Sequence, residues 1–467
     1  MRVRFGLCIA AVGTSMAGGA HAATFSVTTT GDAGAGSLRD AITQANAAAG
    51  PHTINLTATG AISLATALPN IAQATKIVGP GAANLSVRGK TGGRFTVFVV
   101  AAAVEISGVT IAGGDGDRAG GIEVRSGSLS LSDSVLADNA ADMGSAIYAS
   151  APLTITRTNI SGNKGGNAAI YALNTATITD SVISDNATTA IVFPPAARVL
   201  TIDRCTLSGN NGARGVGGLQ LQGGTAVVTN STFSGNIGRL GGDFWTYSDG
   251  VTFQLLNVTA IGGSAPSVLA DHAATFSLRN TILSGTGDRC RVARMNITTK
   301  GHNLSSDATC QLADATDKPS TAPMAGDLAD NGGLTKTHAL LAGSPAINAG
   351  DNASLPATDQ RGRARISGAA VDIGAYEVQE DVDAGTDADA GTGTDTDAGT
   401  DAGSDAGLDA SFDAGPRDAG ADAGGGGGDD GCDMAPGRGG GGTGAAASAL
   451  VLGFLFARRR RVTGWRS

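Results

Sequence analysis

A short phrase that recurs five times constrains this chain more than any other feature. Its copies close on Asn139, Asn163, Asn186, Asn210 and Asn236, so they follow one another at steps of 24, 23, 24 and 26 residues. Within each copy apolar and polar residues alternate and β-branched residues are frequent, which indicates a strand. The copies read LSDSVLADN, ITRTNISGN, ITDSVISDN, IDRCTLSGN and VTNSTFSGN. One strand-rich coil per step of this size predicts a parallel β-helix.

A second apolar phrase lies between the copies of the first. It reads GGIEV at Gly120, SAIYA at Ser145, AAIYA at Ala168, TAIVF at Thr189, GGLQL at Gly217 and GDFWT at Gly242. Each coil therefore supplies at least two strands, with a Gly or Asn turn between them. We predict an all-β fold, a right-handed parallel β-helix with a single-stranded solenoid path and three short sheets around a narrow core.

The N-terminus has the pattern of a secretory signal peptide. Arg2 and Arg4 precede an apolar run, and Ala20-His21-Ala22 forms a small-residue cleavage pattern, so residues 1–22 are expected to be removed after Ala22. A buried strand or helix is the alternative. Export implies an oxidising compartment, in which disulfides persist.

Two cysteines in the later part of the body flank a loop of 19 residues. For Cys290 and Cys310 we favour a disulfide over free thiols or metal ligands, and chain entropy gives such a bond about 3 kcal/mol of stabilisation. Cys205 instead falls in an inward column of small residues and is expected to be a buried free thiol. The other members of that column are Ser134, Thr158, Ser181 and Ser231.

Residues 23–56 are expected to cap the first coil, because an open end of a β-helix exposes unpaired backbone. A helix is predicted from about Ser37 to Ala48, with Ser37 as N-cap and Gly50-Pro51 ending it. The phrase GAGSLRDAI resembles the CSLREA module of exported bacterial β-helix proteins, with Gly36 at the position of the module's Cys. Coils are then expected over residues 57–300.

Residues 301–379 are expected to form a C-terminal cap. The phrases DNGG, THAL, GSPAI, DQRG and DIGA begin at Asp330, Thr337, Gly343, Asp359 and Asp372. In this order they resemble the C-terminal region of the choice-of-anchor Q family, exported proteins of the pectin-lyase-like β-helix type. Leu340, Leu341, Ala346, Ile347, Ile373 and Tyr376 are interpreted as apolar cover for the last coil. Asp359, Arg361, Arg363 and Asp372 are interpreted as a buried ion-pair network that locks the cap, with a binding site as the alternative.

The chain ends in a low-complexity segment and a tail. Residues 380–431 are rich in Asp, Ala and Gly and are expected to be a disordered stalk. Residues 432–467 contain Cys432, an apolar run and four consecutive arginines, which resembles a MYXO-CTERM sorting signal. That resemblance implies removal of the tail near Cys432, anchoring at the cell surface or outer membrane, and contact with the membrane through the tail. A buried terminal helix is the alternative.

The charge distribution argues against nucleic-acid binding. The formal total is −9, and the segment from Glu380 to Asp433 contributes −15 through 16 acidic residues and Arg417. The first 22 residues contribute +2 and the residues after Asp433 contribute +6, so the β-helical body is close to neutral at −2. A nucleic-acid partner requires a basic face. We expect a monomer whose partners are extracellular polysaccharide or other surface proteins.

Two columns of polar residues are the candidates for a catalytic or binding site. One column reads Gly108, Asp133, Arg157, Asp180, Arg204, Asn230, Asn257 and Asn280, and the other is the row of closing asparagines. We favour a stacking role, with charge balance between neighbouring coils and side-chain bonds between the asparagines. The alternative is a polysaccharide lyase or glycoside hydrolase that uses Asp133, Arg157, Asp180 and Arg204, or Asp115 and Asp117 with Arg118.

The leading hypothesis is a non-enzymatic, adhesin-like or glycan-binding surface protein without a cofactor. Calcium is considered only under the enzyme alternative. Short loops between coils leave little material for a walled cleft, which favours binding over catalysis.

Overall fold

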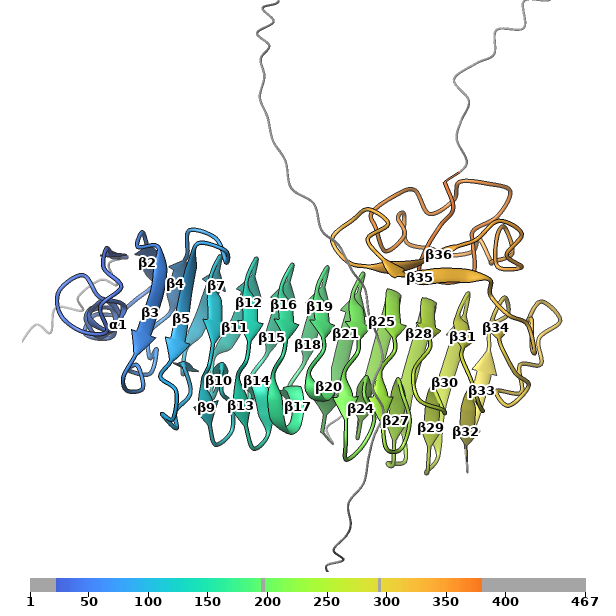
Figure 1. Ribbon diagram of the computed structural model, residues 1–467, viewed down its shortest axis with the longest axis horizontal. Helices are drawn as coiled ribbons and strands as arrows, with labels where there is room; N and C mark the ends of the chain where they lie inside the picture. Colours follow the sequence, from blue (N-terminus) through green and yellow to red (C-terminus); the bar gives the residue numbers. More distant parts are fainter. Residues whose placement is uncertain (1–21, 195–197, 293–294, 380–467) are drawn as a thin grey trace, which may run out of the picture. The chain divides into compact units, whose positions relative to one another are not determined.

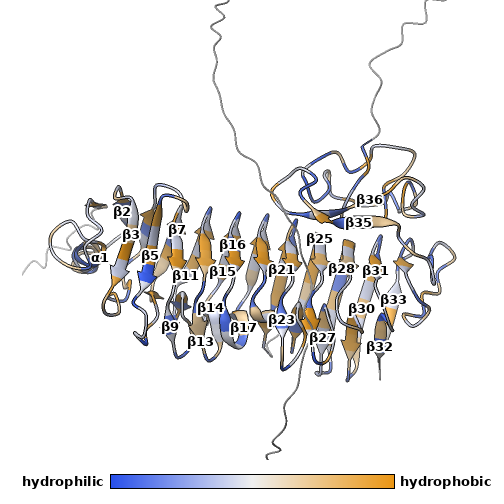
Figure 2. Ribbon diagram, viewed as in Figure 1, coloured by the Kyte–Doolittle hydropathy of each residue, from blue (hydrophilic) through white to orange (hydrophobic). Residues whose placement is uncertain are grey.

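The computed structural model describes residues 22–194, 198–292 and 295–379, and it confirms the predicted right-handed parallel β-helix. Its strands form three ladders, and in each ladder a strand pairs in parallel with the equivalent strand of the next coil (Figure 1). Successive coils are therefore spaced about 4.8 Å apart. Figure 2 shows apolar residues concentrated in the strands of the coils.

The first and second ladders lie in one sheet. The strands of the first are β1 (Thr24–Val27), β2 (His52–Leu56), β4 (Thr75–Val78), β7 (Ala103–Ser107), β11 (Ser128–Ser132), β15 (Leu153–Thr156), β18 (Ala176–Thr179), β21 (Val199–Asp203), β25 (Thr225–Ser234), β28 (Val251–Ile261), β30 (Ala274–Arg279) and β33 (Met295–Thr299). The second contains β3 (Gly60–Leu64), β5 (Leu85–Gly89), β8 (Thr110–Ala112), β12 (Val135–Ala137), β16 (Asn159–Ser161), β19 (Val182–Ser184), β22 (Thr206–Ser208), the later halves of β25 and β28, β31 (Ile282–Ser284) and β34 (Leu304–Ser305).

The third ladder closes each coil. It contains β6 (Phe98–Val100), β10 (Ile122–Val124), β14 (Gly144–Ala149), β17 (Lys164–Ala172), β20 (Ala187–Phe193), β24 (Leu219–Leu221), β27 (Phe244–Thr246), β29 (Val268–Ala270) and β32 (Cys290–Val292). Short corner strands pair between neighbouring coils, namely β9 (Asp115–Gly116), β13 (Ala140–Ala141), β23 (Asn211–Gly212) and β26 (Ile237–Gly238). One apolar cluster from Val27 to Leu312 fills the space between the ladders.

The mixed Asp, Arg and Asn column forms the turn between the first and second ladders. Every member has a positive φ, from 45° at Asn230 to 66° at Gly108. Side chains at such positions cost backbone energy, and Asn and Asp tolerate the left-handed region better than Arg does. The chain therefore bends at the same point in each coil, and these side chains point away from the core in one row.

The closing asparagines form the ladder of side-chain bonds that the sequence predicted, but not in the left-handed turn position. The left-handed residue is the one before, for example Asp138 and Gly162. Each asparagine is buried, and the Nδ2 of each of the first four donates to Oδ1 of the next, at 3.0 Å from Asn139 to Asn163 and 2.8 Å from Asn186 to Asn210, while Asn236 donates to Asp243. Each Nδ2 also donates to a backbone carbonyl, as from Asn186 to Ile160. The row thus satisfies buried backbone groups at one corner of the coils.

The N-terminal helix is confirmed at Leu38–Asn46 (α1), where Ser37 Oγ accepts a hydrogen bond from the Asp40 amide at 3.2 Å. Its buried face consists of Leu38, Ala41, Ile42 and Ala45. Strand pairing, however, begins before the helix, because β1 already pairs with β2. The first ladder therefore starts at Thr24 and not, as expected, after residue 56.

The C-terminal region does not simply cover the end of the last coil. Residues up to Leu312 complete the last coil, with Cys310 and Leu312 in the main core. The antiparallel pair β35 (Ala325–Ala329) and β36 (Thr337–Leu340) and the loops that follow lie beside the second ladder (Figure 1). Leu340, Ala346 and Ile373 pack against Ile282 and Leu304 on that side, with Ile347 and Tyr376 partly buried beside them. Leu341, predicted as cover, is 49% exposed.

The predicted disulfide between Cys290 and Cys310 is present, and Cys205 is a buried free thiol as expected. No helix among the described residues is both long enough and apolar enough to span a membrane. Residues 1–21, the stalk and the tail with Cys432 lie outside the described residues, and Ala22 is exposed.

Candidate functional site: a groove beside the C-terminal region

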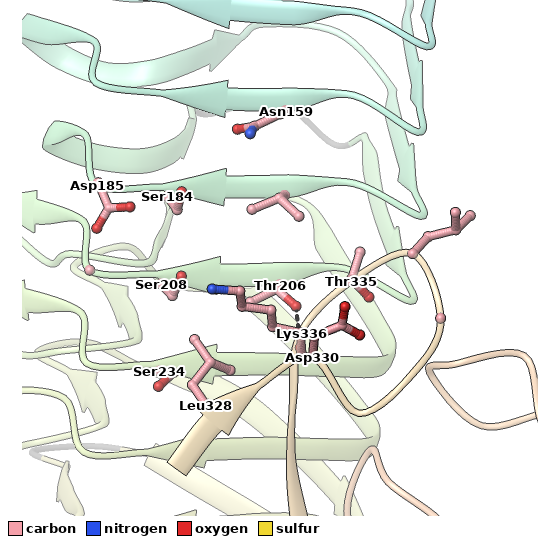
Figure 3. A pocket seen from close by; sticks show the side chains of 14 residues that line it. Asn159, Ser184, Asp185, Thr206, Ser208, Ser234, Leu328, Asp330, Thr335 and Lys336 are labelled. Atoms are coloured by element: carbon pink, nitrogen blue, oxygen red, sulfur yellow. Dashed lines mark hydrogen bonds between the residues drawn. The ribbon is translucent and has the colours of Figure 1, made fainter. Parts of the chain in front are cut away.

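A polar groove of about 570 Å³ lies on the second ladder, beside residues 328–336 of the C-terminal region. Its floor is formed by the outer faces of β16, β19 and β22, and its wall by residues 328–336 (Figure 3). The wall comes from a segment that is distant in sequence. A groove is therefore present although the loops between the coils are short. We name it the ladder groove, lined by Asn159, Val182, Ser184, Asp185, Thr206, Ser208, Gly209, Ser234, Leu328, Asp330, Gly333, Leu334, Thr335 and Lys336.

A row of hydroxyl groups runs along the floor. Ser184, Ser208 and Ser234 occupy the same register position on successive strands, about 4.8 Å apart. Figure 3 shows these side chains one after another, with the Lys336 side chain extending over Ser208. Lys336, Asp185 and Asp330 are exposed, so the groove combines neutral hydroxyl groups with one cation and two carboxylates.

Hydrogen bonds to the coils hold the wall in place. Thr335 Oγ1 donates to the Arg204 carbonyl at 3.1 Å, and Thr206 Oγ1 donates to the Lys336 carbonyl at 2.5 Å. His338 lies with Nδ1 2.8 Å from the Gly326 carbonyl and Nε2 2.9 Å from Ser234 Oγ. A carbonyl only accepts, so Nδ1 carries the proton and Nε2 accepts from Ser234. Burial lowers the pKa of His338, which favours this neutral form.

The Asp and Arg column borders this face, and its members pair along the stack. Arg157 binds Asp133 through two bonds of 2.6 and 2.8 Å, and Arg204 binds Asp180 through bonds of 2.7 and 2.9 Å. The hydrogen bonds from Arg157 hold the pKa of Asp133 below its usual value. Arg204 also contacts Asp203, whose pKa is raised by burial. Their geometry is that of the stacking pairs described above, with each carboxylate already occupied by a guanidinium.

The other candidate carboxylates lie at a different corner. Asp115 and Asp117 are exposed, and Arg94 joins Asp117 at 2.9 Å and Asp142 at 3.0 Å. Arg118 instead approaches Glu123 at 3.5 Å and lies over the Tyr148 ring at 5.6 Å. The structure therefore does not bring Asp115 and Asp117 together with the Asp133 to Arg204 column.

Sequence reasoning missed Glu123, which is 4% exposed on the outer face of the third ladder. Arg125 joins it at 2.8 Å. The apolar and polar alternation in GGIEV predicts that the Glu123 side chain points away from the core. It does not predict that this side chain is buried, because burial on the outer face depends on the segments that cover it. Its two arginine partners compensate the cost of a buried charge.

The interpretation of a buried ionic lock in the C-terminal region holds in part. Asp359 and Arg361 pair at 2.8 Å, with side chains 0% and 2% exposed. Asp372 accepts hydrogen bonds from the backbone of Asn348 and Val378. Arg363 is exposed and lies outside the lock. Instead Arg365 is buried, and its guanidinium donates to the carbonyls of Asp372 and Gly374.

Among the residues that the structure describes, no group of three or more His, Cys, Asp or Glu side chains is arranged to hold a metal ion.

The fold and the groove define a right-handed parallel β-helix with an open polar groove on one side. The family model described as "Right handed beta helix region" matches residues 89–236. Among solved structures, the chain is similar to the crystal structure of pectate lyase Pel9A, with 15% identity and a TM-score of 0.43. That alignment covers 76% of this chain and 96% of the lyase chain. No curated protein matches the sequence.

Proposed function

We propose that this chain is an exported protein, held at the cell surface by its tail, that binds extracellular polysaccharide without cleaving it. The ladder groove carries the proposal. It is open, it runs across parallel strands, and its floor repeats one hydroxyl group per coil at Ser184, Ser208 and Ser234. A repeating polymer is the ligand that such a repeating row of donors and acceptors fits.

The enzyme alternative would require a free acid or base beside the bound polymer. The candidates that the sequence predicted on this side, Asp133 and Asp180, are each held by an arginine through two bonds, whereas the groove residues Asp185 and Asp330 are exposed to solvent. A carboxylate that accepts two charge-assisted bonds and has a lowered pKa, as Asp133 has, is a poor proton donor near neutral pH. We therefore favour binding.

The experiment is a screen of the purified protein against a polysaccharide panel for both binding and depolymerisation. We expect retention of at least one polysaccharide with no new chain ends. Ser208→Trp should block the groove and abolish retention, whereas Thr154→Trp, on the exposed face of the first ladder, should not. Depolymerisation by the unmodified protein, lost in Arg157→Ala or Arg204→Ala, would establish the enzyme alternative instead.

The resemblances to the CSLREA module, the choice-of-anchor Q family and the MYXO-CTERM signal support the proposed export and anchoring. Cys432, followed by an apolar run and Arg458 to Arg461, supports cleavage and attachment at the tail. Replacing Cys432 with Ala should release the protein into the medium or leave it at its uncut mass. Unchanged retention and mass would contradict the proposed anchor.

A further inference from the structure

One coil has an unusually short connection between its closing asparagine and the third ladder. Asn186 and Ile191 are separated by five positions, whereas Asn210 and Leu219 are separated by nine. Ile191 and Leu219 are register partners, so the comparison is between equivalent points of neighbouring coils. The chain passes directly into β20 here, while in the next coil residues 213–218 lie between β23 and β24. A loop that is present in the neighbouring coil is therefore missing.

The missing loop leaves a notch of about 460 Å³ over β20. Loops of the flanking coils form its walls, with Asn167 on one side and Arg214 on the other, and Thr188 and Thr189 line its floor. Two coil spacings separate the flanking coils, or about 10 Å. The notch therefore has room for one sugar ring of a polymer.

The polar groups on the walls are available to a ligand. Asn167 and Arg214 are exposed, and neither side chain makes a hydrogen bond or ion pair with another described residue. A guanidinium presents several N–H donors in a fixed plane, and an amide presents both a donor and an acceptor. Asp142, whose carboxylate is paired with Arg94 at 3.0 Å, also lines the notch, so the lining holds one formal positive and one formal negative charge. The lining is therefore close to neutral overall.

Aromatic side chains lie on β17, which is next to β20, and on β27, which is two strands away on the other side. Tyr171 on β17 is in register with Val192 of β20, is only partly buried, and stacks on Tyr148 with ring centres 5.6 Å apart and planes inclined by 10°. On the other side Trp245 lies 5.1 Å from Tyr247, which is 40% exposed. A Cβ at Gly215 would lie 3.2 Å from the Trp245 ring, so the Arg214 loop rests on this aromatic pair.

We infer that this notch is a second carbohydrate site, which binds one neutral hexose unit of a polysaccharide. Asn167 and Arg214 bind the hydroxyl groups of the sugar, which lies over Thr188 and Thr189. The inference rests on the proposed function for the class of ligand, but it uses a different face and different residues. Two separate sites would allow one chain to hold two glycan strands.

The test is calorimetric titration of the full chain with neutral hexose hexamers of glucose, galactose and mannose. Two equivalents of the recognised hexamer should bind. Arg214→Ala with Asn167→Ala should remove one of them and weaken its affinity at least tenfold, whereas Ser208→Trp should remove the other. Arg239→Ala, an exposed arginine in the loop of the next coil that does not line the notch, is the matched control.

The outcomes separate the two proposals. If Ser208→Trp abolishes all binding and the notch variants change nothing, the second site is refuted and the ladder groove stands. If only the notch variants abolish binding, the groove is refuted and the notch stands. If none of the three hexamers binds to the unmodified chain, the neutral-hexose site is refuted, while an acidic ligand for the groove is decided by the polysaccharide panel.

Discussion

Thr232 Oγ1 donates a 2.6 Å hydrogen bond to Gln360 Oε1 across a sequence separation of 128 residues. Both side chains are buried. The Gln360 amide nitrogen lies 3.0 Å from Thr206 Oγ1 and 3.2 Å from the Cys205 carbonyl, on the preceding coil. One amide therefore joins the C-terminal region to two successive coils, next to the wall of the ladder groove.

Removal of this amide should loosen the C-terminal region from the coils. In Gln360→Ala, the buried Thr232 hydroxyl loses its acceptor and the Cys205 carbonyl loses one of its two donors, and we expect a loss of about 3 kcal/mol in the free energy of unfolding. Urea unfolding measures the loss, and proteolysis should then cut first within residues 325–379. Gln254→Ala, at an exposed position of the first ladder, should stay within about 0.5 kcal/mol of the unmodified protein. Equal losses in the two variants would contradict this account.

The repeat was sufficient to predict the coils, because stacking imposes the same requirement on each copy. Alternation placed the apolar residues inside, and the row of closing asparagines predicted the buried side-chain ladder. The helix start followed from Ser37, whose hydroxyl has the expected capping bond. These features depend on contacts between neighbouring coils, which the sequence shows as a periodic pattern.

No periodic pattern in the sequence predicts the position of the groove wall. The contact between Thr206 and Lys336 joins segments 130 residues apart, and residues 301–379 contain no repeat. The turn-forming residues of the C-terminal region indicated bends, but not the face on which the region would pack. Composition likewise did not distinguish Arg363, which is exposed, from Arg365, which is buried. Only the long-range packing determines which arginine enters the interior.

The asparagine ladder offers a second prediction. Asn186 Nδ2 donates to Asn210 Oδ1 and to the Ile160 carbonyl, and Asn186 Oδ1 accepts from the Asn163 amide at 3.0 Å. Asn186→Ala leaves several buried groups unpaired, so we expect a loss of about 3 kcal/mol by urea unfolding. Asn159→Ala, at an exposed position of the second ladder, serves as the control. A loss no larger than that of the control would show that the ladder does not stabilise the coils.

The disulfide supports a third prediction. The Cys290 to Cys310 bond closes a short loop at the last coil, and its loss should lower the free energy of unfolding by about 3 kcal/mol. Unfolding of the unmodified protein should shift to lower denaturant in the presence of a reductant, whereas the double variant Cys290→Ser, Cys310→Ser should unfold at that lower value with or without it. Cys205→Ala keeps the disulfide and should still respond to the reductant. If the reductant shifts the unfolding of the double variant by the same amount, the shift does not come from reduction of the Cys290 to Cys310 bond.

Asp243 gives a prediction for the dependence of stability on pH. Asn236 Nδ2 donates to its Oδ1 at 3.1 Å, while Oδ2 is buried without a partner among the described residues. Arg289 lies nearby, but its guanidinium donates to Ser267 and to backbone carbonyls. Burial raises the pKa of Asp243 from 3.8 to about 6.

Because the folded pKa lies above the unfolded value, the folded state holds the Asp243 proton more tightly. This contribution to stability is complete below about pH 4 and is lost as the pH rises through 6, at about 1.4 kcal/mol per pKa unit. Asp243→Asn keeps an oxygen for Asn236 but does not titrate. By urea unfolding we expect it to exceed the unmodified protein by about 2 kcal/mol at pH 8 and to match it near pH 4. Asp249→Asn, whose side chain is 75% exposed, should show no such divergence. A difference for Asp243→Asn that is constant between pH 4 and 8 would mean that Asp243 does not titrate in this range.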